Sequence, residues 1–166
     1  MGIEIERKFL VSGEGWRMGE PVLFRQGYLN RDKHRTVRVR LAGSVGVLTV
    51  KGVSSGMTRA EYEYTIPRSD ALEMLDLCEG PLIEKKRWLV PIGNMTWEVD
   101  EFLGDNLGLI VAEIELEDEA QAFQRPSWLG KEVTDDNRYF NSSLSRTPFK
   151  SWGVVEDKEA EAGGIA

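Results

Sequence analysis

Polar and apolar residues alternate along many short stretches of this chain, beginning with residues 3–10. In that stretch Glu4, Glu6 and Lys8 occupy every second position, and apolar residues such as Ile3 and Ile5 lie between them. Successive side chains of a β-strand point to opposite faces, so the stretch predicts a strand with one ionised and one apolar face. An ordinary antiparallel sheet with one face in water shows the same alternation. One such strand therefore does not decide the architecture.

The alternation recurs, and its recurrence is more informative. Further strands are expected at residues 24–30, 36–41, 45–51, 58–66, 82–90, 96–102 and 109–116. Their ionised positions come in pairs two residues apart, such as Arg38 with Arg40. Gly27 inside a strand indicates a bulge or a close approach of another segment. The chain is therefore expected to be rich in strands, most of which carry one charged face, whereas residues 24–30 lack a charged pair.

Helices are expected between and after these strands. Residues 70–78 predict a helix with Asp70 as its N-cap and an end at Gly80. Two shorter helices are expected at residues 118–124 and 136–144.

The charged strand faces form one basic and one acidic set. The basic set is Lys8, Arg38, Arg40, Lys51, Arg59, Lys85 and Arg87. The acidic set is Glu4, Glu6, Glu61, Glu63, Glu98, Asp100, Glu113 and Glu115. A face that only met water would also use many neutral polar residues. We therefore predict an α+β fold, a closed eight-stranded antiparallel β-barrel or tunnel with a charged interior, flanked by helices that cover its apolar outer faces.

A barrel with so many interior charges needs a highly charged guest, because buried charges are costly unless they are paired or bound. Clustered carboxylates suit hard cations such as Mg²⁺ or Mn²⁺, which take oxygen ligands. Arginines and lysines suit phosphate oxygens. The expected guest is a short polyphosphate chain together with divalent metal.

Composition narrows the class of protein. The 166 residues fit one domain, expected at residues 1–150, followed by an acidic tail at residues 151–166 that is expected to be flexible. The net charge of −7 argues against nucleic acid as a partner. No apolar run approaches the roughly 20 residues that span a bilayer, and the first residues are charged, so no membrane is expected and the predicted location is cytoplasmic.

Other candidate sites are weak. The sequence has no glycine-rich phosphate loop, no dinucleotide fingerprint and no zinc spacing. His34, the only histidine, is expected to be exposed in a turn, and Cys78, the only cysteine, to pack in the core. The scattered tryptophans are expected to pack outside the charged face. Tyr28 could reach the interior or simply pack.

The ordered series of charged pairs resembles a known family, the CYTH domain of the triphosphate tunnel metalloenzymes. The resemblance covers residues 2–144. The matching residues are Glu4-x-Glu6-x-Lys8, Arg38-x-Arg40, Lys51, Arg59-x-Glu61-x-Glu63, Lys85-x-Arg87, Glu98-x-Asp100 and Glu113-x-Glu115. The run Gly130-Lys131-Glu132-Val133-Thr134, followed by Arg138-Tyr139 and Asn141, is similar to the closing segment of short bacterial members.

The resemblance implies an eight-stranded tunnel that binds a triphosphate and requires Mg²⁺ or Mn²⁺, with two ions expected. Family members include inorganic triphosphatases, thiamine-triphosphatases, RNA 5′-triphosphatases and a class of adenylate cyclases. The compact layout is most similar to bacterial members that favour inorganic tripolyphosphate. The expected reaction is hydrolysis of tripolyphosphate to pyrophosphate and phosphate.

Roles for the charged residues follow as a hypothesis. One metal would be held by Glu4, Glu6, Glu113 and Glu115, and a second by Glu61, Glu63 and Asp100, which also orient its water. The substrate would be bound by Lys8, Arg38, Arg40, Lys51, Arg59, Lys85 and Arg87. Lys85 or Lys8, crowded by other cations, is a candidate to assist the attacking water. Lys86 faces the other way, so a slip of one residue would exchange it with Lys85.

Alternatives remain open at this point. One is an adenylate cyclase or a thiamine or nucleoside triphosphatase, which would need a pocket for the organic half of the substrate. Another is a module that binds triphosphate or polyphosphate without hydrolysing it. A homodimer is possible, and the sequence does not decide the oligomeric state.

Overall fold

The computed structural model describes residues 2–152 of the chain. Its strands are β1 (Ile3–Val11), β2 (Val22–Asn30), β3 (Arg35–Ala42), β4 (Val45–Gly52), β5 (Thr58–Ile66), β6 (Ile83–Ile92), β7 (Met95–Phe102), β8 (Ile110–Glu115) and β9 (Leu129–Glu132). Its helices are α1 (Arg68–Leu77), α2 (Asn141–Leu144) and the 3₁₀ turns η1 (Gly104–Asn106), η2 (Asn137–Tyr139) and η3 (Phe149–Ser151).

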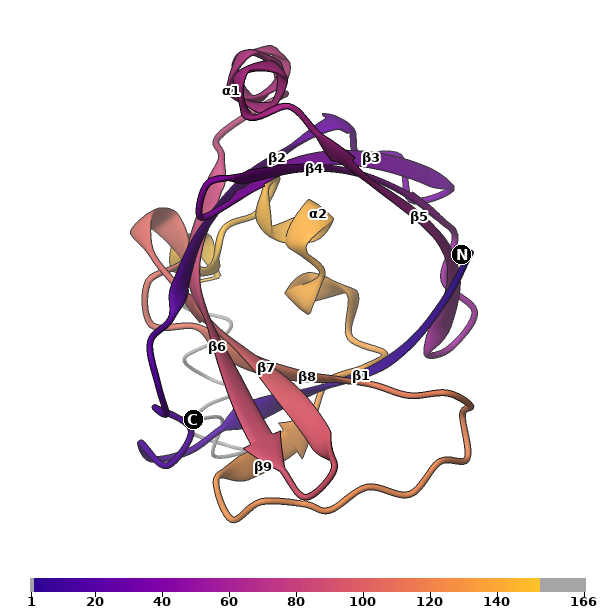
Figure 1. Cartoon of the computed structure of the whole chain (residues 1–166), viewed down its shortest axis with the longest axis vertical. Helices are drawn as coiled ribbons and strands as arrows, with labels where there is room; N and C mark the ends of the chain where they lie inside the picture. The colour runs from indigo at the N-terminus through magenta and orange to yellow at the C-terminus, as the bar shows by residue number, and fades with distance from the viewer. Residues whose placement is uncertain (1, 153–166) are drawn as a thin grey trace.

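The sheet closes on itself into a barrel, which Figure 1 shows end on. The strands follow the order β5-β4-β3-β2-β6-β7-β8-β1-β9, and β5 also pairs with β1, where Ile3 faces Ala60. β9 lies outside this ring and extends the same edge of β1 beyond the β5 pairing, where Phe9 faces Glu132. The named strands pair antiparallel throughout. The predicted closed eight-stranded antiparallel barrel is confirmed, with one extra strand.

Tight hairpins set the register of the ring. Two-residue connections at 43–44 and 93–94 join β3 to β4 and β6 to β7. Each begins with a glycine in the left-handed region, at a φ of 59° for Gly43 and 63° for Gly93. Such turns match the twist of paired strands and fix which side chains face each other. The charged positions of neighbouring strands are therefore held in a defined order around the barrel.

The apolar outer face is covered in two places. Helix α1 packs over β3 and β4 through Ala71 and Leu75, which contact Val39 and Leu41. On the other side, a tryptophan-rich cluster that includes Trp16, Trp97 and Trp128 packs against β1, β6, β7 and β8. No named helix contributes to that second cluster, so the expected covering by helices is correct for α1 only.

One end of the barrel interior is apolar. Leu10, Ile83 and Phe102 point inward there and pack with Tyr139 and Leu144 of the closing segment. Figure 1 shows α2 inside the ring of strands. The interior is therefore not uniformly charged, because this end is filled by a hydrophobic cluster.

Gly27 shows the close approach that the sequence predicted. A Cβ atom at Gly27 would lie 2.8 Å from Sγ of Cys78 and 2.7 Å from a methyl carbon of Leu82. Only glycine fits this contact, which sets the chain after α1 against β2. Cys78 is half-buried and packs against the α1 cluster, in keeping with the predicted packing role.

Three predicted helices differ from the structure. Helix α1 begins at Arg68, directly after Pro67, and Asp70 lies in its first turn without acting as the cap. The expected helix at 118–124 is absent, because the Asp118 carboxylate accepts a hydrogen bond from the Ala120 backbone at 2.7 Å and forms a local turn. The expected helix at 136–144 breaks at Phe140, whose backbone is extended, with η2 before it and α2 after it.

Within residues 2–152, no helix has the length and apolar character that crossing a membrane requires. The predicted acidic tail at 151–166 lies outside the described residues except for Ser151 and Trp152. The ring of Trp152 packs edge-on against Tyr139 at 5.2 Å between centroids, so the folded body reaches at least this residue.

Candidate active site in the barrel interior

The barrel encloses a cavity of about 180 Å³ whose wall is mostly ionised. The wall contains all the predicted phosphate-binding cations, Lys8, Arg38, Arg40, Lys51, Arg59, Lys85 and Arg87. It also contains the predicted metal-binding carboxylates Glu4, Glu6, Glu61, Glu63, Glu113 and Glu115. The remaining predicted carboxylate, Asp100, is 2% exposed and lies behind the wall.

Strand register places opposite charges beside one another at the β1–β8 seam. Lys8 faces Glu113 across the strands, and its Nζ lies 2.9 Å from Glu6 and 3.3 Å from Glu113. Burial by itself would lower the pKa of Lys8, but the two carboxylates raise it well above its ordinary value. Burial favours the neutral form of Glu6, but the Lys8 ammonium lowers its pKa. The β1–β8 seam thus pairs a buried lysine ammonium with two carboxylates.

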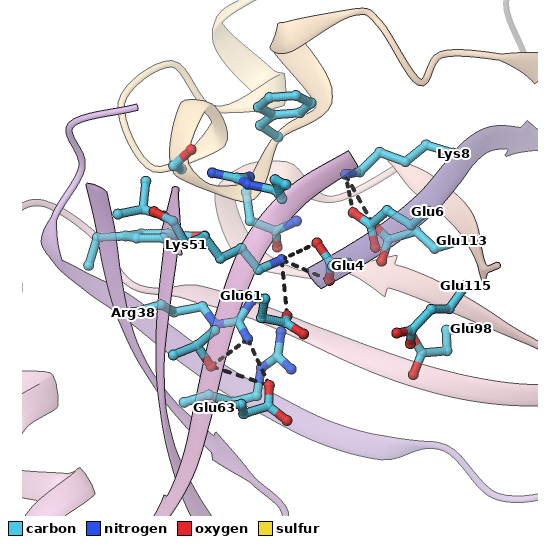
Figure 2. Close-up of a pocket in the computed structure, with 18 of the residues that line it drawn as sticks. Glu4, Glu6, Lys8, Arg38, Lys51, Glu61, Glu63, Glu98, Glu113 and Glu115 are labelled. Atoms are coloured by element: carbon cyan, nitrogen blue, oxygen red, sulfur yellow. Dashed lines mark hydrogen bonds and ion pairs between the residues drawn. The ribbon is translucent and has the colours of Figure 1, made fainter. Parts of the chain in front are cut away.

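A second cluster spans β1, β3, β4 and β5, as Figure 2 shows. Lys51 Nζ lies 3.0 Å from Glu4 and 3.6 Å from Glu61. Arg38 donates to the Thr49 hydroxyl at 3.1 Å and lies 3.8 Å from Glu63. These contacts bring together side chains that are distant in the sequence.

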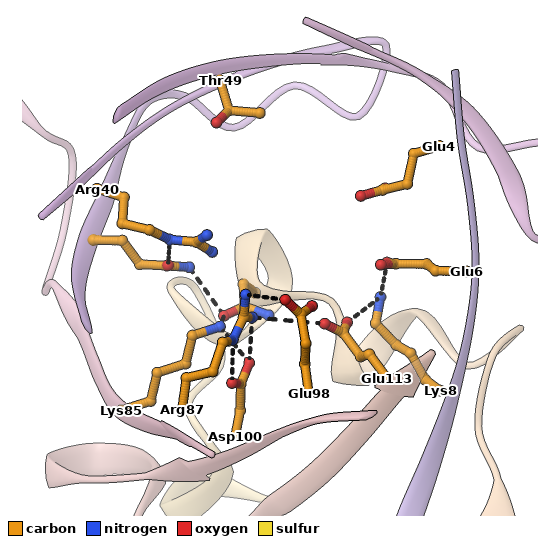
Figure 3. A network of polar contacts seen from close by, with 12 residues as sticks. Glu4, Glu6, Lys8, Arg40, Thr49, Lys85, Arg87, Glu98, Asp100 and Glu113 are labelled. Atoms are coloured by element: carbon orange, nitrogen blue, oxygen red, sulfur yellow. Dashed lines mark hydrogen bonds and ion pairs between the residues drawn. The ribbon is translucent and has the colours of Figure 1, made fainter. Parts of the chain in front are cut away.

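A third cluster is centred on Asp100, drawn in Figure 3. Its carboxylate lies 2.7 Å from Lys85 Nζ and accepts two hydrogen bonds from Arg87, at 2.8 and 2.9 Å. Burial favours the neutral acid, but Arg87 and Lys85 hold the pKa of Asp100 far below its usual range. Both oxygens are therefore engaged by protein cations. Because Asp100 also does not line the cavity, it fits a counter-ion for Lys85 and Arg87 better than a metal ligand.

The two candidate lysines differ in charge state. Burial lowers the pKa of Lys85 to about 7. The charges of Arg87 and Arg40 lower this pKa as well, and the Asp100 carboxylate opposes the change. Lys8 is held cationic by its carboxylates. Of the two, only Lys85 can be a neutral amine near neutral pH.

Two arginines of the cavity wall lack a carboxylate partner among residues 2–152. Arg40 donates its Nε to Gln26, and Arg59 donates to the backbone oxygen of Gly52 at 2.8 and 3.0 Å. In addition, the buried Nε of Arg38 has no hydrogen-bond partner in the described part of the chain. Unpaired buried cationic groups are costly without a ligand. The arrangement therefore suits a multiply charged anion.

Several carboxylates also converge in the cavity wall. Burial raises the pKa of Glu115, and nearby Glu4 and Glu98 raise it further. Burial also raises the pKa of Glu98 and of Glu4. For Glu4, the Lys51 ammonium opposes this rise. Within residues 2–152, no group of three or more acidic, histidine or cysteine side chains forms a ready-made metal site. These residues still fit Mg²⁺ or Mn²⁺, because Mg²⁺ is usually held by one or two carboxylates while water and substrate phosphate complete its shell.

Several wall residues were not predicted. Thr36, Thr49, Phe140, Asn141 and Ser142 line the cavity, and Tyr28 does so as well, which settles its orientation. Thr49 shares the inward alternation of Lys51 but carries no charge to mark it. Phe140 lies 4.9 Å below Lys8 Nζ, measured to the ring centroid. Phe140, Asn141 and Ser142 come from the closing segment, where strand alternation gives no signal.

The other sequence interpretations fit the structure. His34 is exposed and lies 3.1 Å from Asp32 in its turn. Lys86 is exposed and Lys85 is buried, so the register has not slipped. No tryptophan within the described residues lines the cavity.

Comparisons with known proteins agree with this geometry. The CYTH domain model matches residues 2–148. An inorganic triphosphatase of Acetivibrio thermocellus is 53% identical over 92% of this chain and 99% of its own length. An inorganic triphosphatase of Nitrosomonas europaea is 38% identical over 86% of this chain and 96% of its own length. A crystal structure described as that of an inorganic triphosphatase superposes with a TM-score of 0.61 at 35% identity, covering 85% of this chain and 96% of that one. Matched over nearly its whole length, the chain belongs to the CYTH domain family.

Proposed function

We propose that this protein hydrolyses inorganic triphosphate to pyrophosphate and phosphate with a divalent metal ion. The observation that carries the proposal is the cavity wall itself. It combines Arg40 and Arg59, which lack carboxylate partners among residues 2–152, with a group of converging carboxylates. The full-length similarity to proteins named inorganic triphosphatase supports the same substrate.

The metal would be held by Glu4, Glu6, Glu113 and Glu115, with Glu61 and Glu63 available for a second ion. A divalent ion held there, Mg²⁺ or Mn²⁺, would supply positive charge to the phosphate and a water of lowered pKa. Burial, and to a lesser degree neighbouring carboxylates, raises the pKa of Glu4 and of Glu115, and a bound cation would offset both effects, which supports this assignment.

The cations would bind and orient the phosphate chain. Arg38, Arg40 and Arg59 offer unpaired N–H groups, and Lys8, Lys51 and Arg87, with Lys85 once it is protonated, add positive charge where negative charge develops on the phosphate oxygens. Water attacks a terminal phosphorus, its oxygen forms the new P–O bond, and the bond to the bridging oxygen breaks to release pyrophosphate. Lys85, whose pKa lies near 7, is the better candidate to accept the proton of that water, and Lys8 stays cationic.

The net charge of −7 supports a small metal-bound anion as substrate and argues against nucleic acid. A cytoplasmic location and a homodimer remain predictions, which fractionation and analytical ultracentrifugation would test.

The test is phosphate release from inorganic triphosphate, ATP, thiamine triphosphate and pyrophosphate, each with Mg²⁺, with Mn²⁺ and with chelator. We expect rapid metal-dependent turnover of inorganic triphosphate and little release from ATP. Formation of cyclic AMP and pyrophosphate from ATP would instead identify a cyclase. Tight binding of triphosphate without turnover of any substrate would identify a binding module.

A further inference from the structure

A pair of neutral side chains lies among the cations of the cavity. Gln26 of β2 is fully buried, and its Oε1 accepts a hydrogen bond from Arg40 Nε at 2.8 Å. Its Nε2 donates to Oδ1 of Asn141 at 3.0 Å, and the same oxygen accepts from Lys85 Nζ at 2.9 Å. We call Gln26 and Asn141 the amide bridge. It links β3, β2 and β6 to the first residue of α2.

Hydrogen-bond chemistry fixes the orientation of both amides. Arg40 Nε–H and the Lys85 ammonium can only donate, so each must meet an amide oxygen. Rotating Gln26 by half a turn would place its NH₂ group against Arg40 and its oxygen against the oxygen of Asn141. Rotating Asn141 would place its NH₂ group against two other donors. The bridge therefore has one consistent arrangement.

The position of β2 explains why its inward face is neutral. β2 lies between β3 and β6, the strands that carry Arg40 and Lys85. The guanidinium groups of Arg40 and Arg87 lie 4.5 and 4.6 Å from the ring centroid of Phe24, which shares the inward face of β2 with Gln26. Figure 3 shows Arg40, Lys85 and Arg87 directed into the same part of the interior. A further charge on β2 would either repel these cations or neutralise them.

We propose that Gln26 and Asn141 are positioning residues of the triphosphate site, which hold Arg40 and Lys85 in place for a phosphoryl group without competing for their charge. Gln26 takes only the Nε of Arg40, so the two terminal nitrogens of the guanidinium stay available for phosphate oxygens. Asn141 accepts a hydrogen bond from Lys85 beside the ion pair of Lys85 with Asp100, adds no charge of its own, and joins α2 to the cations. The inference rests on the proposed function for the identity of the anion.

Isosteric acids test the proposal, because they keep the shape and the acceptor atoms. Gln26→Glu would turn the Arg40 hydrogen bond into an ion pair and remove the donor to Asn141. We expect the Kd for inorganic triphosphate, measured by calorimetry without metal, to rise on the order of 10-fold to 100-fold. KM should rise by a similar factor, and kcat should fall less. Gln124→Glu, in an exposed position, adds the same charge away from the cavity and should leave Kd and KM unchanged.

A structural role alone would give a different result. If Gln26→Glu lowers the unfolding temperature but leaves Kd and KM within twofold of the parent protein, the positioning role is wrong. Should Gln26→Glu fail to fold, the half-buried Asn141→Asp decides on the same readouts. Failure of the proposed function is separate, since the unmodified protein would then neither bind nor hydrolyse triphosphate.

Discussion

The barrel interior has a charged region and an apolar end, and the same strands build both. Along β1 the inward positions are Glu4, Glu6 and Lys8, and the next is Leu10. The charged region is a set of ion pairs with several unpaired donors, and the apolar end is a packed cluster closed by Leu144 of α2. Buried ion pairs contribute little net stability, whereas packed apolar side chains contribute much. The difference indicates that the apolar end stabilises the fold and the charged region is kept for the ligand.

The comparison predicts first that breaking a buried ion pair of the charged region is costly. Asp100→Asn would leave Lys85 and Arg87 buried beside a neutral amide. We expect the free energy of unfolding to fall by about 3–5 kcal/mol. Urea denaturation at pH 7 measures this change. Asp105→Asn, which breaks an exposed pair with Lys150, should cost less than about 1 kcal/mol.

The pH dependence of this difference has a defined sign. The pKa of Asp100 is lowered in the folded protein, so its contribution is present above the ordinary aspartate pKa of about 3.9. The contribution is lost as the pH falls further, through the folded pKa. The stability gap between the parent and Asp100→Asn should therefore shrink in strong acid. Because the pKa of Lys85 lies near 7, the part of the gap that depends on its ammonium also narrows as the pH rises through 7, whereas the part carried by Arg87 persists. A gap that did not shrink in strong acid would contradict the counter-ion assignment.

The second prediction concerns a carboxylate that serves the ligand. Glu6→Gln should reduce metal-dependent turnover of triphosphate by roughly 10²-fold to 10³-fold, because it removes a proposed metal ligand. Initial rates over a range of Mn²⁺ concentrations measure the effect. Glu84→Gln, exposed on the outward face of β6, is the matched control. Near-normal turnover in Glu6→Gln would refute the metal assignment for β1.

The third prediction moves to the apolar end. Leu144 is 1% exposed, and Leu144→Ala should lower the free energy of unfolding by about 2–3 kcal/mol through loss of packing. Turnover of the remaining folded protein should change far less than in Glu6→Gln. The control is Leu77→Ala, since Leu77 is 72% exposed on α1. Equal destabilisation in both variants would show that the interior cluster does not carry the stability assigned to it.

Strand alternation predicted much of this molecule because it depends on local geometry. Inward and outward faces follow from a period of two, so Lys85 was separated correctly from Lys86, and the closed barrel followed from the number of charged faces. Alternation does not say where along a strand the inward face becomes apolar. That Lys8 lines the charged cavity and Leu10 joins the apolar cluster therefore becomes clear only from the paired strands.

Strand alternation could not predict the structure of the closing segment. Residues 136–144 carry a helical pattern, yet Phe140 is extended so that its ring meets Lys8 and the next residue, Asn141, enters the cavity. Those contacts depend on strands more than fifty residues away. Likewise, Asp100 shares the inward alternation of Glu98, and only its contacts with Lys85 and Arg87 distinguish a counter-ion from a ligand.

The smallest predicted effect is the uptake of part of a proton by Lys85 when triphosphate binds. The pKa of Lys85 is about 7, so at pH 8 the free site holds mostly the neutral amine. A bound anion favours the ammonium form, so binding of triphosphate without metal should take up part of a proton. Calorimetry in two buffers of different ionisation enthalpy measures this uptake. Lys85→Arg is always charged and should show less uptake than the parent, by up to about one proton. Equal uptake in both would mean that Lys85 is already protonated in the free site, and would remove it as the proton acceptor.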